Sequence, residues 1–236
     1  MSETMRIQRA LARAGILSRR KAEELVANGR VTVNGVLAQV GQTVDPARDV
    51  IKVDGERIAA PAALEWFVLH KPTGVITSRH DPEGRKTVFD LVPQRPGLTY
   101  VGRLDYLTEG VLLLTTDGAA AHRLTHPSRE IERIYRVSAL GDGESAAEEI
   151  REGVELEDGL VRPKKVTAEK VGRGRYELMI TISEGRNREV RRLCEAVGLE
   201  VDRLVRVKFG PVELGDLAVG RVRSLTKQEK AAIDKL

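Results

Sequence analysis

The residues best suited to catalysis lie between positions 102 and 118, in the run GRLDYLTEGVLLLTTDG. A strand is expected to end near Leu104, a short polar loop presents Asp105, and an apolar strand follows at residues 111–114. A carboxylate on a short loop between two buried strands is held rigidly, which suits a nucleophile or a general base. An aspartate that only caps the turn fits the same spacing equally well.

A second candidate group is the arginine-rich run EGRNREVRRL at residues 184–193. Val190 and Leu193 have the spacing of a buried helix face, which predicts a helix over residues 187–197 with Asn187 as its N-cap. The helix dipole disfavours cations at this end, so arginines there indicate phosphate binding or a partner carboxylate; a solvated basic face is the alternative. The arginines of the run are Arg186, Arg188, Arg191 and Arg192.

One tyrosine lies beside arginines in an expected strand. Tyr135 shares a strand face with Arg133 and Val137 in the strand expected at residues 131–140. Its ring is suited to stacking on a base, and an ordinary half-buried core tyrosine explains the pattern equally well.

Several other chemistries are excluded by what the chain lacks. His122 and His126 have a metal-like spacing, but no acidic residue accompanies them and Pro127 ends the helix, so we expect no metal site. No Walker A or Gly-x-Gly-x-x-Gly motif is present, so no nucleotide cofactor is expected. No apolar run approaches the ~20 residues of a membrane helix, and the first residues lack the apolar segment of a secretory signal. A single cysteine, Cys194, indicates a reducing, cytoplasmic location.

Positive charge is concentrated at the start of the chain. The net charge of the 236 residues is +4, and residues 1–30 alone hold seven Lys and Arg against three Glu. Such a local surplus favours phosphate as a partner. Ser18 is a good N-cap for a helix over residues 19–28, and the free N–H groups of its first turn would lie beside Arg19, Arg20 and Lys21.

The first part of the chain resembles an S4 RNA-binding domain. The runs IQRALARAG, SRRKAEEL and GRVTVNG carry the resemblance, which covers residues 5–58. They fit a helix ended by Gly15, a second helix, and a hairpin around Asn34-Gly35. The resemblance implies that four residues face RNA, namely Arg19, Arg20, Lys21 and Arg30.

Nearly the whole chain resembles the RsuA/RluB branch of the pseudouridine synthases, and within it the RluB type. Besides the runs above, the motifs are KPTGV, DPEGR, THPSRE and RIY, beginning at residues 71, 81, 125 and 133. Arg133 stands where many members have lysine, so the charge is kept. The resemblance implies isomerisation of uridine to pseudouridine in rRNA, in the large subunit rather than the small one, without a cofactor.

The resemblance also implies roles for individual residues. Asp105 would be the nucleophile or base, with Arg191 as its salt-bridge partner and Tyr135 against the uracil. The uridine would have to leave the base stack, at a cost of about a few kcal/mol, and Arg103 would fill the vacated place. Further RNA contacts would come from Arg186 and Arg188.

The predicted fold class is α+β. A small S4-like α/β module occupies residues 1–60, a linker residues 59–63, and a catalytic domain residues 64–236 with a mostly antiparallel mixed sheet flanked by helices. In that domain we expect strands at residues 65–70, 100–104, 110–115, 131–140, 161–171, 176–183 and 204–209. We expect helices at residues 119–125, 144–152 and 187–197.

Two other functions compete with this interpretation. A non-enzymatic ribosome assembly factor would use the S4-like module alone and would leave the second domain without a role. A glycoside hydrolase would use Asp105 with Glu109, but it would leave the basic start of the chain unused, and 3% aromatic residues are few for binding sugars. The expected partner is rRNA, with ribosome assembly intermediates as an open extension and no membrane.

Overall fold

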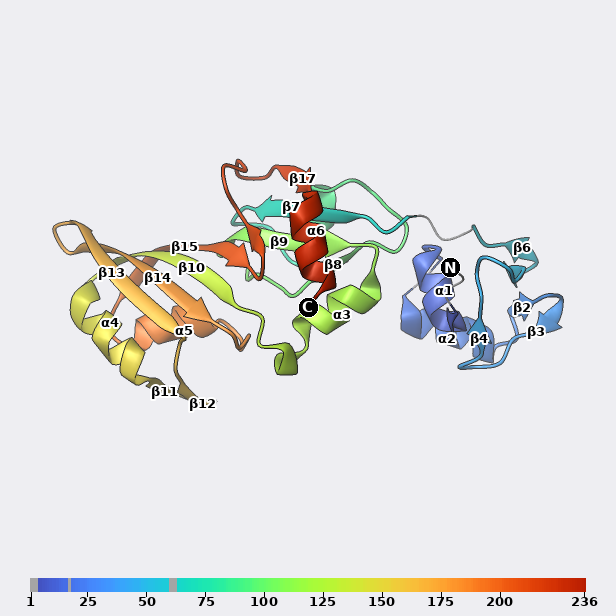
Figure 1. Cartoon of the computed structure of the whole chain (residues 1–236), viewed down its shortest axis with the longest axis horizontal. Helices are drawn as coiled ribbons and strands as arrows, with labels where there is room; N and C mark the ends of the chain where they lie inside the picture. The colour runs from blue at the N-terminus through green and yellow to red at the C-terminus, as the bar shows by residue number, and fades with distance from the viewer. Residues whose placement is uncertain (1–3, 17, 60–62) are drawn as a thin grey trace. The chain divides into compact units, whose positions relative to one another are not determined.

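The computed structural model describes residues 4–16, 18–59 and 63–236. These residues form two compact units, which we describe separately (Figure 1). The first unit comprises the chain up to Trp66 together with Pro93–Thr99 and Thr115–Ala119, and the second comprises the remainder. Positions 60–62 of the expected linker lie outside the described residues.

The first unit combines two helices with short strands. Its sheet has the order β3-β2-β5-β6, and β1 pairs separately with β4. Asn34 and Gly35 have φ of 52° and 85°, the left-handed backbone that a two-residue hairpin turn between β2 and β3 requires. The elements are β1 Met5–Arg6, α1 Ile7–Arg13, α2 Arg19–Ala27, β2 Val31–Val33, β3 Val36–Leu37, β4 Thr43–Val44, β5 Ile51–Val53 and β6 Glu56–Arg57.

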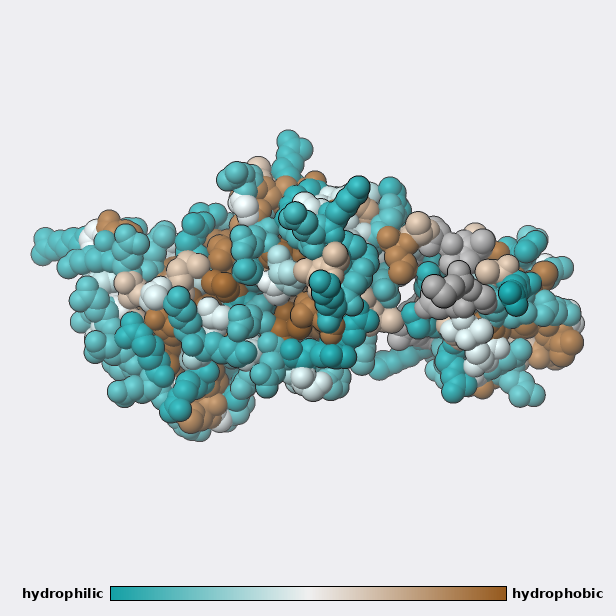
Figure 2. All heavy atoms as spheres, in the orientation of Figure 1, coloured by the Kyte–Doolittle hydropathy of each residue, from teal (hydrophilic) through white to brown (hydrophobic). Residues whose placement is uncertain are grey.

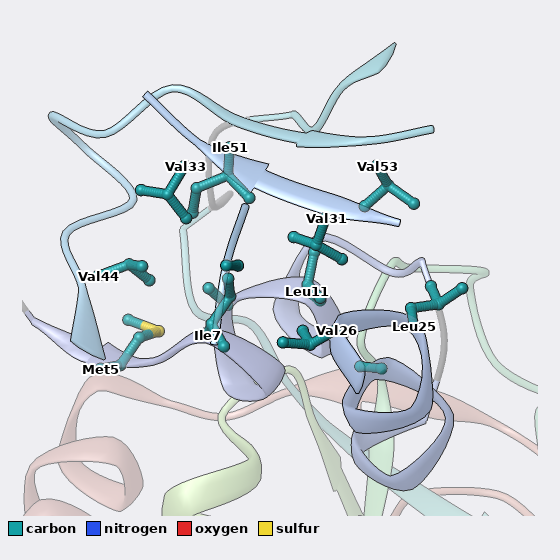
Figure 3. Packing of buried hydrophobic residues seen from close by; sticks show 13 residues of the cluster. Met5, Ile7, Leu11, Leu25, Val26, Val31, Val33, Val44, Ile51 and Val53 are labelled. Atoms are coloured by element: carbon teal, nitrogen blue, oxygen red, sulfur yellow. The ribbon is translucent and has the colours of Figure 1, made fainter. Parts of the chain in front are cut away.

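The core of this unit is small and aliphatic. The labelled side chains of Figure 3 point into the space between the two helices and the sheet. Ile7, Ala10 and Leu11 lie in the core as their helical spacing predicts, whereas Ala14 is only half-buried at the end of α1. Ser18 caps α2 as expected, because its hydroxyl accepts the N–H of Lys21 at 3.4 Å.

The second unit is built on a nine-stranded sheet. Seven strands follow the order β13-β14-β10-β15-β9-β7-β17, with β16 beside β15 and β8 beside β9. β10 pairs antiparallel with β14 and β15, as do β13 with β14, β15 with β16 and β17 with β7, whereas β15 and β9 are parallel. The predicted mixed, mostly antiparallel sheet is thus confirmed. The strands are β7 Trp66–Lys71, β8 Thr99–Val101, β9 Glu109–Thr115, β10 Arg133–Leu140, β13 Lys165–Gly172, β14 Arg175–Ile182, β15 Glu200–Phe209, β16 Val212–Glu213 and β17 Val222–Ser224.

Helices cover part of this sheet. In Figure 1, α4 and α5 lie along β13, β14 and β15, and Gly143 allows α4 to approach closely because a Cβ there would lie 2.4 Å from the Tyr176 ring. The helix predicted to begin at Asn187 begins at Glu189. Arg188 occupies the N-cap position with φ of 47° and no side-chain cap, so the prediction of Asn187 as the cap is wrong. The helices are α3 Gly118–Thr125, α4 Gly143–Glu152, α5 Glu189–Ala196 and α6 Lys227–Asp234.

The strand predicted at residues 161–171 is two strands. Pro163, which has no N–H for a sheet, interrupts the run between β12 Gly159–Val161 and β13. β12 pairs with β11 Val154–Leu156, a hairpin that the sequence pattern did not predict. Neither β17 nor α6 was predicted.

The face that Figure 2 shows is mostly polar, and hydrophobic residues form only small groups on it. Among the described residues, no helix is long and apolar enough to cross a bilayer.

We expect Gly110→Ala to weaken the sheet strongly. Gly110 faces Arg206 across the parallel contact of β9 with β15 and has φ of 111°, and a Cβ there would lie 2.1 Å from the Arg206 carbonyl oxygen. The free energy of unfolding should fall by about 2–4 kcal/mol. Urea unfolding followed by the fluorescence of Trp66, the only tryptophan and buried in β7, measures this change.

The matched control is Gly172→Ala. A Cβ at Gly172 in β13 meets its nearest atom at 3.7 Å, so this variant should lose less than about 1 kcal/mol. Equal losses in the two variants would contradict the proposed close contact.

Candidate active site

A cavity of about 750 Å³ opens in the second unit, a volume that suits a small organic ligand such as a nucleobase. Its lining comes from the loop before β9, from β10 and β15, and from the start of α5. The cavity thus joins segments that are far apart in the sequence. Four predicted catalytic residues line it, namely Arg103, Asp105, Tyr135 and Arg191.

Asp105 lies on a tight turn whose backbone is fixed from two sides. Its carbonyl oxygen accepts the N–H of Thr108 at 3.1 Å, and its side chain is exposed. The preceding residue, Leu104, is anchored by Thr77, whose hydroxyl donates to the Leu104 carbonyl at 2.8 Å. The backbone around the carboxylate is therefore immobilised while the carboxylate itself stays accessible.

The second anchor of this turn is a buried lysine. The ammonium group of Lys71, at the end of β7, donates to the carbonyl oxygens of Pro72, Asp105 and Thr108 at 2.9–3.0 Å. Burial lowers the pKa of Lys71 to about 8, while the charges of Asp105 and Glu109 act in the opposite direction. Lys71 entered the sequence prediction only as the first residue of the KPTGV motif, so its role as an anchor of this turn was not predicted.

Tyr135 lies in β10 and is buried, with 8% of its surface exposed. It faces Arg206 of β15 in the sheet register, so the two side chains lie on the same face, and both line the cavity. The ring is therefore positioned beside the cavity that Asp105 also lines.

Arg191 does not form the expected ion pair with Asp105, since no N–O distance between these two side chains is 4.0 Å or less. Its guanidinium instead donates to the carbonyl oxygens of Leu107 at 3.4 Å and Val201 at 3.5 Å. Because Leu107 belongs to the same turn as Asp105, Arg191 still brings a positive charge to that turn.

The other arginines of the run have different partners. Arg186 donates to the Glu184 carboxylate at 2.7 Å and to three carbonyl oxygens of residues 158–160, and Arg192 binds the Asp158 carboxylate at 3.0 and 2.8 Å. Both therefore hold the β11–β12 hairpin beside α5. Arg188 is exposed, with a 3.7 Å ion pair to Glu195.

Two further charged residues at the cavity were not predicted as functional. Glu189 is 4% exposed and accepts the N–H of Arg186 at 3.0 Å, and burial raises the pKa of its carboxyl group. Arg206 is 2% exposed. Neither residue had a sequence signal, because a single charge in an apolar strand or a basic run is ordinarily solvent-facing.

Arg133, which was noted for its charge, has backbone partners. Its Nη1 donates to the carbonyl oxygens of Ser183 at 3.1 Å and Glu184 at 2.6 Å. Arg103 is exposed and makes no hydrogen bond or ion pair with the described residues.

The residues predicted to face RNA in the first unit lie on or near α2. Arg20 and Lys21 are exposed, and the side chain of Arg19 lies outside what the structure describes. Arg30 is exposed as well, and it forms a two-pronged ion pair with Asp54 at 2.8 and 2.5 Å.

Residues 4–16, 18–59 and 63–236 contain no group of three or more His, Cys, Asp or Glu side chains that could hold a metal ion. His126 has a local structural role, since its Nδ1 accepts the N–H of Ser128 at 3.3 Å.

Comparisons with known proteins agree with this arrangement. Residues 65–196 match the RNA pseudouridylate synthase family, and residues 5–51 match the S4 domain. The chain is 30% identical to a solved pseudouridylate synthase, with a TM-score of 0.66 and coverage of 97% of this chain and 99% of the other.

Curated relatives are similar over most of the chain. A protein named ribosomal large subunit pseudouridine synthase B from Salmonella typhi is 45% identical over 91% of this chain and 76% of its own length. The protein of the same name from Pseudomonas aeruginosa is 46% identical over 95% of this chain, which spans only 60% of that longer protein.

An uncharacterized RNA pseudouridine synthase from Mycobacterium bovis is 40% identical, with 95% of this chain and 91% of the relative covered. The family match spans more than half of the chain, and it includes the turn that carries Asp105 and the start of α5. The chain therefore belongs to the RNA pseudouridylate synthase family.

Proposed function

We propose that this chain converts uridine to pseudouridine in large-subunit ribosomal RNA and that Asp105 acts on the sugar of the target nucleotide. The observation that carries the proposal is the turn of Asp105, held by buried Lys71 at a cavity shared with Tyr135 and Arg191. The choice of large-subunit RNA rests on the names of the relatives.

The reaction breaks the C1′–N1 bond of uridine, turns the base and joins C1′ to C5. The carboxylate of Asp105 can act on the sugar as a nucleophile or as a base, as carboxylates do in glycoside chemistry. Lys71 and Arg191 bring positive charge to the turn that carries this carboxylate.

The remaining cavity residues have supporting roles in this proposal. Tyr135 packs against the uracil, and Arg103, exposed at the cavity, occupies the place that the flipped nucleotide leaves in the RNA. Arg188 contacts RNA directly. Arg186 has several intramolecular partners, and it contributes by holding the hairpin at the cavity.

In this proposal, residues 1–60 form the S4 domain, residues 59–63 a linker and residues 64–236 the catalytic domain. The S4 domain supplies affinity for RNA. Arg19, Arg20, Lys21 and Arg30 contact phosphates. The substrate includes ribosome assembly intermediates, and the enzyme works in the cytoplasm. A function as a purely RNA-binding assembly factor would not explain the match to an enzyme family or the arrangement of residues around Asp105.

Mapping of pseudouridine in rRNA tests the function directly. Cells that lack this protein should lose pseudouridine at a position of the large-subunit rRNA, and the wild-type chain should restore it. Asp105→Asn should not restore it, because the charge is removed at nearly constant shape, and turnover of the purified variant should fall by about 10³-fold or more.

The control for this variant is Asp216→Asn, an exposed aspartate outside the cavity. It should restore the modification, and both variants should bind the RNA with affinity close to wild type. Near-normal turnover by Asp105→Asn would refute the assigned role, and loss of a pseudouridine only from small-subunit rRNA would refute the proposed substrate.

Arg20→Ala combined with Lys21→Ala should weaken RNA binding. If each residue contacts one phosphate, the slope of log Kobs against log salt concentration should shrink by about 1.5 in magnitude. Filter binding at several salt concentrations measures the slope, and the rate at saturating RNA should stay near wild type.

Lys227→Ala combined with Lys235→Ala removes the same charge from exposed sites in the other unit and serves as the control. If both double variants changed the slope equally, the effect would be one of net charge and not of contacts made by the S4 domain.

Lys71→Met should change how stability depends on pH. Burial lowers the pKa of Lys71 from 10.5 to about 8, so between these values the unfolded chain binds more protons than the folded protein. The contribution of Lys71 to the free energy of unfolding therefore rises with pH, by up to about 1.4 kcal/mol per pH unit.

Urea unfolding between pH 7 and 10 should show the wild type gaining stability relative to Lys71→Met above about pH 8. The exposed control Lys227→Met should show no such trend. A difference between wild type and Lys71→Met that is constant over this range would contradict the assigned burial of the charge.

A further inference from the structure

The cavity contains a buried arginine whose hydrogen bonding is incomplete. Arg206 lies in β15 at the middle of the sheet, 2% exposed, with Tyr135 beside it on β10 and Gly110 on β9. Its Nε donates to the carbonyl oxygen of Val111 at 2.8 Å. Its Nη2 is buried and has no hydrogen-bond partner.

The surroundings of Arg206 do not neutralise its charge. No carboxylate among the described residues lies within 4.0 Å of its guanidinium, and its charge acts on two other cations, Lys71 and Arg133. Two of these cations share one ring, since the guanidinium carbons of Arg206 and Arg133 lie 5.2 and 5.3 Å from the centre of the Phe209 ring.

Such an arrangement is unfavourable unless a bound molecule supplies the missing hydrogen-bond acceptor. A buried donor without an acceptor loses its hydration without replacement, and the penalty is larger when the group is charged. Arg133, its cationic neighbour, has two carbonyl acceptors, and Arg186 and Arg191 at the same cavity also have acceptors. Among the described arginines that line the cavity, Arg206 is thus the one that is buried and has an N–H group without an acceptor.

We propose that Arg206 donates to a carbonyl oxygen of the uracil in the cavity and stabilises the negative charge that the base acquires during the reaction. The proposal rests on the proposed function and adds a catalytic residue to it. Arg206 is suited to this task because it is prepositioned by the sheet and by Val111, and because its charge is shielded from water.

The chemistry requires such a donor. When the C1′–N1 bond breaks, its electron pair stays on the base and is shared by N1, O2 and O4. The turned base then uses the electron pair at C5 to bond C1′, the proton at C5 leaves, and N1 takes up a proton, so the atoms balance without an oxidant or a cofactor. A cation that touches O2 or O4 binds the anionic base more tightly than the neutral uridine, which lowers the barrier.

The test uses RNA oligonucleotides that contain the mapped target as uridine, 2-thiouridine or 4-thiouridine. Sulfur accepts hydrogen bonds more weakly than oxygen, so in the wild type one thio substitution should slow the single-turnover rate. Arg206→Met should lower the rate on uridine by about 10²-fold, as removal of one preorganised donor does, with RNA affinity within about threefold of wild type. In this variant the penalty of that thio substitution should disappear.

Arg203→Met is the matched control, because Arg203 lies in the same strand and binds Glu109 away from the cavity lining. It should keep the thio penalty of the wild type. If Arg206→Met does not fold, as judged by its unfolding midpoint, Arg206→Lys takes its place. Lysine retains the charge and offers a different donor geometry, so the thio penalty should be reduced.

Three outcomes overturn the proposal: thio penalties that remain unchanged in the Arg206 variants, no thio penalty at either position in the wild type, or a normal rate for Arg206→Met. A merely structural role predicts the first of these, since it slows all three substrates equally. If the wild type made no pseudouridine in any rRNA, the proposed function itself would fail, which is a separate result.

Discussion

The parallel contact between β9 and β15 determines where the cavity of the second unit lies. At Gly110 and Arg206 the two backbones approach so closely that a side chain on Gly110 would collide with the neighbouring strand. The turn that carries Asp105 comes directly before β9, and Arg206 lies on β15. This single contact therefore brings together residues about a hundred positions apart in the sequence, and the cavity is formed where they meet.

The electrostatics of the cavity follow from that geometry. Arg206 is close enough to affect both Lys71 and Arg133, and burial removes water that would otherwise screen these charges. Backbone carbonyls solvate Lys71 and Arg133, which keeps cations in the interior without carboxylate partners. The result is a concentration of positive charge at the cavity that Asp105 also lines and where, in the proposed reaction, a base becomes an anion.

The arginines at the start of α5 bind other parts of the second unit. These arginines were expected to bind phosphate or a catalytic carboxylate. Instead, Arg186 donates to carbonyl oxygens of the β11–β12 hairpin, and Arg192 binds the Asp158 carboxylate. Arg191 reaches the turn of Asp105 through the Leu107 carbonyl. A helix N-terminus rich in cations is tolerated here because local acceptors on a neighbouring hairpin compensate for the dipole.

The sequence by itself determined many of the local elements and the identity of the chemical groups. Helical spacing, the Ser18 cap and the Asn34-Gly35 turn predicted the first unit, and the GRLD run singled out Asp105, because these signals depend only on neighbours in the chain. The tertiary structure alone decided which distant groups meet. The roles of Lys71 and Arg206 were invisible because a charged residue in an apolar strand looks the same whether it faces water or a cavity, and only the packing of β7, β9, β10 and β15 fixes that choice.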